Sequence, residues 1–169
     1  SGVASLTRRY VRAAKSECRI LDTRKTTPGL RALEKAAVRA GGGANHRGSL
    51  SDFILIKDNH LGGLSIPDAV RRARLQWPSR TVEVECDTID QVQQAVDVGV
   101  DVVMLDNMSP TQVKECVRIV AGACPIEVSG GVTLETVGEY ADAGANYISV
   151  GAITHSAPIL DIALDLETA

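Results

Sequence analysis

Apolar runs of strand length recur six times along the chain, and most are followed by a segment with the helical spacing of apolar residues. The expected strands cover residues 19–21, 53–56, 81–85, 102–105, 125–128 and 147–150. Repeated strand–helix order predicts a parallel sheet. No GxGxxG opening is present, and the units are short, which favours a barrel over a doubly wound sheet.

The length of the chain limits how complete that barrel can be. A full (β/α)₈ barrel takes about 250 residues, whereas this chain has 169 residues. We therefore expect an α/β fold, an incomplete TIM-like (β/α) barrel with about six parallel strands.

Capping and stop residues define the predicted helices. The expected N-caps are Ser65, Thr88, Ser109 and Thr133, and the expected stops are Gly99, Gly122 and Gly144. The first helix after the first strand is opened by Pro28 and stopped by Gly41–Gly43. It is expected to bury Leu30, Leu33, Ala37 and Val38 on one face.

The first 16 residues form a separate element. Apolar residues lie there among basic ones at helical spacing, namely Val3, Leu6, Tyr10, Val11 and Ala14. We interpret 1–16 as a helix that leads in from an upstream domain and 17–169 as the catalytic barrel domain. The chain begins at Ser1 rather than at methionine, which favours a processed or excised piece.

Composition excludes several classes of protein. With 44% hydrophobic and 23% charged residues, the chain is not mainly disordered, and no apolar run approaches the ~20 residues that a membrane span needs. Five aromatic residues and a net charge of −3 argue against nucleic-acid binding. The four cysteines lack metal-ligand spacing, which favours reduced thiols in a cytoplasmic protein.

The basic residues are concentrated in the first third of the chain. Residues 1–57 hold twelve of the eighteen lysines and arginines but only four acids, whereas residues 58–169 hold seventeen acids. Most of these charges are explained as solvated helix faces. Arg24, Lys25, Arg47 and Lys57 instead fall at predicted turns. If they converge on one barrel mouth, they favour an anion with several oxygens, such as a carboxylate or phosphate.

Every predicted strand ends in charged, hydroxyl or glycine residues, at the end where barrels of this type place their sites. Glu85 and Asp106 follow successive strands and offer oxygen ligands of the kind that Mg²⁺ prefers, although Glu85 can equally form a structural ion pair. Ser129-Gly130-Gly131 and Gly151-Ala152 supply backbone N–H groups for a phosphate. His46, beside Arg47, either donates to an anion or is a hydrogen-bonded structural histidine.

The residues that follow the strands also resemble a known family. The segments that carry the resemblance, in chain order, are DTRKTTPG (22–29), GGANHR (42–47), LIKDNH (55–60), VEVE (82–85), LDN (105–107), EVSGG (127–131) and VGAITHS (150–156). Together they are similar to quinolinate phosphoribosyltransferase, the decarboxylating nicotinate-nucleotide pyrophosphorylase, over nearly the whole chain.

The resemblance implies a reaction and a set of site residues. Quinolinate and 5-phosphoribosyl-1-pyrophosphate (PRPP) would give nicotinate mononucleotide, pyrophosphate and CO₂, with Mg²⁺ as the cofactor, in NAD synthesis. Quinolinate would be held by Thr23, Arg24, His46, Arg47 and Lys57. Lys25, Ser129, Gly130, Gly131, Val150, Gly151, Ala152 and His155 would bind the phosphates of PRPP, and Glu85 and Asp106 would bind the metal. Lys25, Lys57, Glu85 and Asp106 would form the catalytic set.

The resemblance also implies a partner. Members of the family carry a further α/β domain before the barrel, which covers the barrel mouth of a neighbouring subunit and supplies another arginine. We therefore expect a homodimer or a larger homo-oligomer. Three alternatives stay open: a barrel domain that binds anions without turnover, a different barrel enzyme acting on a phosphorylated sugar, and a transport-associated relative with another substrate.

Overall fold

Six parallel strands form one sheet in the computed structural model, which describes residues 1–15 and 17–166. The strands are β1 (Arg19–Leu21), β2 (Ile54–Ile56), β3 (Val82–Cys86), β4 (Val102–Asp106), β5 (Ile126–Ser129) and β6 (Tyr147–Ser149). Each lies within one residue of its predicted bounds, and all pair in parallel in the order β1-β6-β5-β4-β3-β2. The predicted α/β class and the six-stranded architecture are confirmed.

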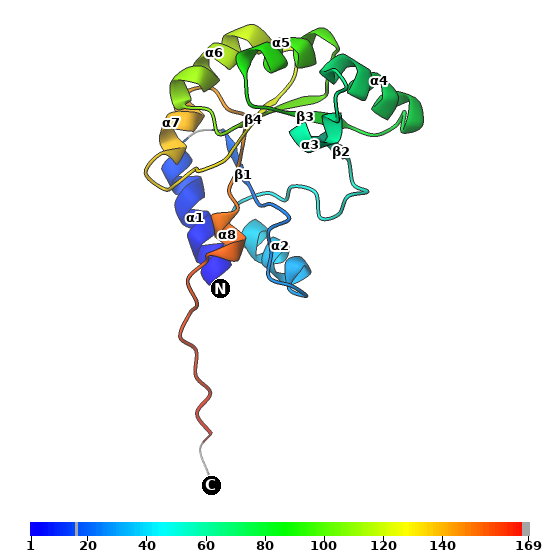
Figure 1. Cartoon of the computed structure of the whole chain (residues 1–169). Helices are drawn as coiled ribbons and strands as arrows, with labels where there is room; N and C mark the ends of the chain where they lie inside the picture. The colour runs from blue at the N-terminus through cyan, green and yellow to red at the C-terminus, as the bar shows by residue number, and fades with distance from the viewer. Residues whose placement is uncertain (16, 167–169) are drawn as a thin grey trace.

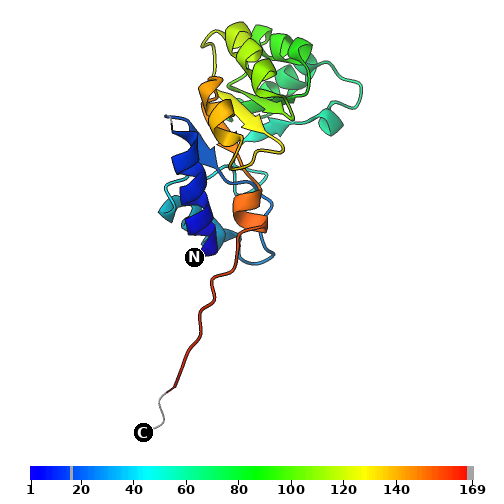
Figure 2. The ribbon, with the colours of Figure 1, turned by 90° about the vertical axis from the view of Figure 1, so that its left-hand side faces the viewer.

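One helix precedes the first strand and the others follow strands, and the longer helices after β2, β3 and β4 cover the outer face of the sheet (Figure 1). The helices are α1 (Gly2–Ala14), α2 (Arg31–Ala40), α3 (Asp58–Leu61), α4 (Ile66–Gln76), α5 (Ile89–Asp97), α6 (Pro110–Val120), α7 (Val137–Asp142) and α8 (Ala152–His155). Figures 1 and 2 show α1, α2 and α8 grouped at one end of the molecule, where they contact one another. Within the described residues no helix is both long and apolar enough to cross a membrane.

The barrel is open between its two edge strands. β1 and β2 stand at opposite ends of the strand order, and an isolated bridge between Leu21 and Ala44 extends the pairing beyond β1. Residues 44–53 lead from this bridge to β2, so they cross the gap between the two edge strands without forming a strand. We call residues 44–53 the crossing segment.

Strand alternation sends two kinds of side chain to the two faces of the sheet. Val84, Val103 and Val128 alternate with the interior-facing residues and are buried under the helices. Cys86 is buried in the same layer. The register places Glu83, Met104, Glu127 and Ser149 on the opposite, interior face. Two carboxylates therefore lie inside the barrel.

Three of the four predicted N-caps are confirmed. Ser65, Thr88 and Ser109 accept hydrogen bonds from backbone N–H groups three residues later. The prediction for Thr133 is wrong, because its N–H donates to Thr136 Oγ1 at 3.0 Å and the chain makes a turn before α7 begins. Glycines follow α5, α6 and α7 at the predicted stops and have positive φ angles.

The predicted apolar face of α2 is wrong in part. Leu30 is 45% exposed and Leu33 69% exposed, whereas Glu34, Lys35 and Val38 are buried. The helix is rotated because its two charged residues have partners inside: Glu34 accepts from the N–H of Thr27 at 3.1 Å, and Lys35 pairs with a buried aspartate. Paired charges override the apolar pattern here.

Helix α1 packs on this domain itself. Tyr10 and Ala14 are buried, and the Tyr10 hydroxyl donates to the carbonyl of Val132 at 3.4 Å. α1 also contacts α2, α7 and β1. The derivation of this helix from an upstream domain stays a prediction. At the other end, residues 157–166 run as an extended segment away from the body (Figure 1).

The buried aspartate at the end of β1 holds the open side of the barrel together. Asp22 is fully buried and forms an ion pair with Lys35 of α2. It also accepts hydrogen bonds from Asn45 Nδ2 at 2.5 Å and from the backbone N–H of His46 at 2.9 Å. One carboxylate thus joins β1, α2 and the segment that follows Ala44.

We predict that Asp22→Ala destabilises the domain by about 3–5 kcal/mol, because it leaves the buried Lys35 ammonium without its partner. Urea unfolding followed by circular dichroism measures the loss. The control is Asp97→Ala, an exposed aspartate on α5 that accepts one hydrogen bond from Gln93. Its cost is expected to stay within about 0.5 kcal/mol. Equal losses in the two variants would contradict the anchoring role of Asp22.

Candidate active site

The loop after β1 presents two basic side chains to solvent. Arg24 and Lys25 are both exposed, and the N–H of Lys25 donates to Thr23 Oγ1 at 3.0 Å. Arg31 of α2 fixes this loop, since its guanidinium donates to Thr26 Oγ1 at 2.9 Å and to the carbonyls of Arg24 and Gly48, each at 3.0 Å. The loop is therefore held against the segment that carries His46 and Arg47.

Arg47 is the buried member of the basic set. Its guanidinium lies 5.6 Å from the centroid of the Phe53 ring, in a cation–π contact. Burial lowers the pKa of Arg47, and the positive charge of Arg24 lowers it further. Two guanidinium groups that repel each other are stabilised by an anion placed between them, and guanidinium forks match carboxylate oxygens well.

Lys57 and Glu85 meet at the carboxyl ends of β2 and β3. They form an ion pair, so Glu85 does make the structural ion pair that the sequence left open as an alternative. Asp106, at the end of β4, lies on the same interior face and accepts from Asn107 Nδ2 at 2.6 Å. Both carboxylates are partly exposed to solvent, and each keeps a second oxygen that takes no hydrogen bond within the described part of the chain. This donor set fits Mg²⁺, which takes one or two carboxylates and keeps waters.

The first glycine loop is packed against the end of β4. Gly130 has a φ of 91°, and a Cβ atom there would overlap the Asn107 side chain. The N–H of Asn107 donates to the carbonyl of Ser129 at 2.9 Å. Gly130 therefore has to be glycine, which brings the Ser129–Gly131 backbone close to Asp106. A turn follows this loop, so α7 does not begin there directly.

The second glycine loop meets the loop after β1. A Cβ on Gly151 would lie 3.0 Å from His155 Nε2 and 3.5 Å from Lys25 Cδ. Thr154 Oγ1 donates to the Lys25 carbonyl at 2.7 Å. Gly151 is the N-cap of α8, and Ala152 is the first residue of that helix. Val150, which precedes them, is buried. Lys25, Gly151 and His155 are thus brought together, next to the β5 loop.

His46 is less exposed than Arg24 and Lys25. Its Nε2 atom lies 3.4 Å from Glu83 Oε2 and 3.4 Å from Glu127 Oε1, inside the barrel. Burial disfavours the imidazolium, but Glu127 and Glu83 outweigh it and raise the pKa of His46 to about 9. Burial raises the pKa of Glu83, because it disfavours the charged carboxylate. This nitrogen therefore faces carboxylates rather than the solvent-facing mouth.

Sequence reasoning missed Glu83 and Glu127. The available signal was a glutamate alternating with valine in a buried strand, as in VEVE at 82–85 and IEV at 126–128. Such a pattern places a charged residue on an interior face, where it needs a partner.

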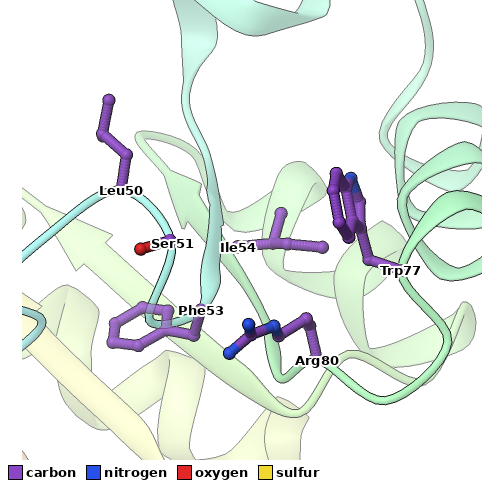
Figure 3. A pocket seen from close by; sticks show the side chains of 6 residues that line it. All are labelled: Leu50, Ser51, Phe53, Ile54, Trp77 and Arg80. Atoms are coloured by element: carbon purple, nitrogen blue, oxygen red, sulfur yellow. The ribbon is translucent and has the colours of Figure 1, made fainter.

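A separate cavity of about 320 Å³ lies beside the edge strand β2 (Figure 3). It is lined by Leu50, Ser51, Phe53, Ile54, Trp77 and Arg80. None of these is a site residue predicted from the sequence. The candidate site is instead the set of loops at the carboxyl ends of the strands.

The fold and these loops define a class: an α/β-barrel domain with a basic anion pocket, paired carboxylates and two glycine loops. The family model described as "Quinolinate phosphoribosyl transferase, C-terminal domain" matches residues 3–165. The chain is 47% identical over 98% of its length to a probable nicotinate-nucleotide pyrophosphorylase [carboxylating] of Bacillus subtilis. It is 45% identical over 98% of its length to a nicotinate-nucleotide pyrophosphorylase [carboxylating] of Mycobacterium leprae.

A solved structure agrees. The crystal structure of nicotinate-nucleotide pyrophosphorylase from Ehrlichia chaffeensis superposes with a TM-score of 0.95 at 44% identity and covers 99% of this chain. The chain belongs to the quinolinate phosphoribosyltransferase family, in the part that the C-terminal domain model describes. It covers 58–62% of the length of these three relatives.

We predict that His46 makes stability depend on pH in metal-free protein. Its pKa is about 9 in the folded chain against 6.5 ordinarily, so its stabilisation is complete below pH 6.5 and is lost as the pH rises through 9. The advantage of the wild type over His46→Gln should therefore shrink by about 1–3 kcal/mol between pH 6.5 and 9.

Urea unfolding at several pH values in the presence of a chelator measures this advantage. His155→Gln, which replaces an exposed histidine, corrects for the removal of a histidine as such. The charged groups that face the His46 ring are Glu83 and Glu127, and Arg19 lines the same cavity. An advantage that stays constant or grows with pH would show that the two glutamates do not hold a proton on His46.

Proposed function

We propose that this domain carries out phosphoribosyl transfer from PRPP to quinolinate, with loss of CO₂, as part of NAD biosynthesis. The observation that supports it most directly is the charge at one mouth: the positive charge of Arg24 lowers the pKa of the buried Arg47, and Lys57 pairs there with Glu85. Two guanidinium groups that influence each other electrostatically suit a ligand with two carboxylates. Lys25, Gly151 and His155 meet alongside, where the phosphates of PRPP would lie.

The proposed reaction needs positioning and charge rather than a protein nucleophile. The pyridine nitrogen forms a bond to the anomeric carbon of PRPP, and the bond from that carbon to the pyrophosphate oxygen breaks. The carboxylate next to the nitrogen then leaves as CO₂. The carbanion left on the ring is stabilised by the adjacent cationic nitrogen and takes up a proton. Atoms and charge are conserved with quinolinate and PRPP as the only organic reactants.

Each set of residues has a role in this proposal. Thr23, Arg24, Arg47 and Lys57 would hold the carboxylates, which fixes the ring for in-line attack. His46 belongs to the same set by resemblance, although its Nε2 faces Glu83 and Glu127. The backbone N–H groups of Ser129–Gly131 and Val150–Ala152 would hold the 5-phosphate, and Lys25 would stabilise charge on the departing pyrophosphate.

Glu85 and Asp106 are the residues proposed to hold Mg²⁺. When bound, the ion would neutralise the negative charge that collects on pyrophosphate. In the metal-free chain Glu85 is paired with Lys57, so Glu85 would hold the ion and Lys57 would hold a substrate carboxylate from neighbouring positions at the mouth. We further propose a cytoplasmic homodimer, or a larger homo-oligomer, whose sites a neighbouring subunit completes.

Two substitutions are predicted to separate the two ligands. Arg47→Ala should weaken quinolinate binding by at least tenfold and PRPP binding little, because it removes a charge-assisted contact. Asp106→Asn should weaken Mg²⁺-dependent PRPP binding and leave quinolinate binding intact. Calorimetric titration of both variants with both ligands measures this, with Asp97→Ala as the matched surface control.

Equal losses of both ligands in Arg47→Ala would refute its assignment, and unchanged PRPP affinity in Asp106→Asn would refute the metal assignment. Turnover has its own readout, the release of CO₂ from labelled quinolinate. Quinolinate and PRPP binding without CO₂ release would favour the alternative of a barrel domain that binds without turnover.

A further inference from the structure

A second cluster of possible metal ligands lies inside the barrel, formed by residues from three elements. His46 lies in residues 44–53, which cross the gap between β1 and β2, whereas Glu83 comes from β3 and Glu127 from β5. One ligand atom from each lies within 4.8 Å of the other two. Their side chains are only 8%, 2% and 3% exposed, so water does not solvate the charges they carry.

The cluster contains polar atoms that the protein leaves unpaired. His46 Nε2 and Glu83 Oε1 are both buried and have no hydrogen-bond partner. Unpaired buried polar atoms are rare in folded proteins and carry a free-energy cost. Here the unpaired atoms face a shared space, so a single bound group could satisfy them together.

The distances match coordination of a metal ion. Nε2 of His46 is 3.4 Å from one oxygen of each glutamate, yet it makes a hydrogen bond to neither. Donor atoms about 2.1 Å from a tetrahedral ion are separated by about 3.4 Å, and Zn²⁺ takes imidazole and carboxylate ligands at that range. A neutral imidazole and two carboxylates would also balance the charge of a divalent ion.

The surroundings of the three ligands resemble the supporting groups of metal sites. Ser149 donates a hydrogen bond to Glu127 Oε1, which orients that carboxylate. The backbone of His46 is held on both sides, by Asp22 at its N–H and by Lys35 Nζ at its carbonyl, 2.8 Å away. The Phe53 ring packs edge-on against the imidazole, with the centroids 5.0 Å apart.

A route for an ion is also present. A cavity of about 260 Å³ is bordered by His46, Glu83 and Glu127, and it reaches Arg19, Thr81 and Tyr147 at the amino ends of the strands. This is the end of the barrel opposite the mouth that holds Glu85 and Asp106. The cavity has room for a water molecule as a fourth ligand.

We propose that His46, Glu83 and Glu127 form a divalent-metal site inside the barrel, selective for Zn²⁺ over Mg²⁺ and distinct from the proposed Mg²⁺ position at the mouth. The nitrogen ligand sets this preference, because Mg²⁺ favours an all-oxygen shell. A bound ion would tie the crossing segment to β3 and β5. Its role would therefore be structural, and its binding is measured without the transferase substrates, although His46 also belongs to the proposed quinolinate set.

The test uses the full chain, stripped with a chelator and titrated with Zn²⁺, and with Co²⁺ as a spectroscopic probe. We expect one ion per chain, a visible Co²⁺ spectrum typical of four-coordinate nitrogen and oxygen ligands, and a rise in Tm on adding Zn²⁺. Glu127→Gln should weaken binding at least tenfold, because it removes a ligand charge. Asp106→Asn, which alters only the mouth, should bind Zn²⁺ as the wild type does.

Several outcomes would overturn the proposal. One is the absence of stoichiometric uptake, which would mean that the cluster holds only protons. Others are binding that survives both Glu127→Gln and Glu83→Gln, or a thiolate-to-cobalt charge-transfer band, which would place the ion on cysteine. If a glutamate variant fails to fold, X-ray absorption of the Zn²⁺-loaded wild type decides: one imidazole with oxygen ligands supports the site, and sulfur or all-oxygen ligation refutes it.

Discussion

The arrangement of the candidate site depends on one buried carboxylate. Asp22 has no solvent exposure, and its charge is compensated by Lys35 and by donors from Asn45 and His46. These partners lie on the helix after β1 and on the segment that crosses the gap between the two edge strands. The two edge strands do not pair with each other across that gap. This polar cluster therefore connects the elements on the open side, as strand pairing connects them elsewhere in the barrel.

The same anchor explains why the basic groups converge. Arg47 follows His46 directly, so fixing the backbone of His46 also fixes Arg47 beside Arg24. Arg31 donates hydrogen bonds to the carbonyls of Arg24 and Gly48, so it connects the loop after β1 to the segment that carries Arg47. The positive charge of Arg24 lowers the pKa of Arg47, and the proposed dianionic ligand would offset the repulsion between the two groups. In the proposed function, the positions of these basic side chains therefore depend on the buried Asp22 carboxylate.

The sequence predicted the fold well and the orientation of individual side chains less well. Strands and helix ends follow local rules of periodicity and capping, so β1 to β6 and caps such as Ser65 were found. Leu33 and Thr133 were misplaced because tertiary partners of Lys35 and a tight turn decide those positions. The sequence identifies His46 as a candidate site residue but not its contacts with Glu83 and Glu127. These three residues are distant in sequence, so no local pattern shows that they meet.

The most direct test of the account is calorimetric titration of this chain with quinolinate, with nicotinate as the control ligand. The two differ by one carboxylate, so the comparison isolates the contribution of the paired guanidinium groups of Arg24 and Arg47. We expect quinolinate to bind at least tenfold more tightly than nicotinate. Equal affinity for both ligands would contradict it, because the basic mouth would then not be a site for two carboxylates.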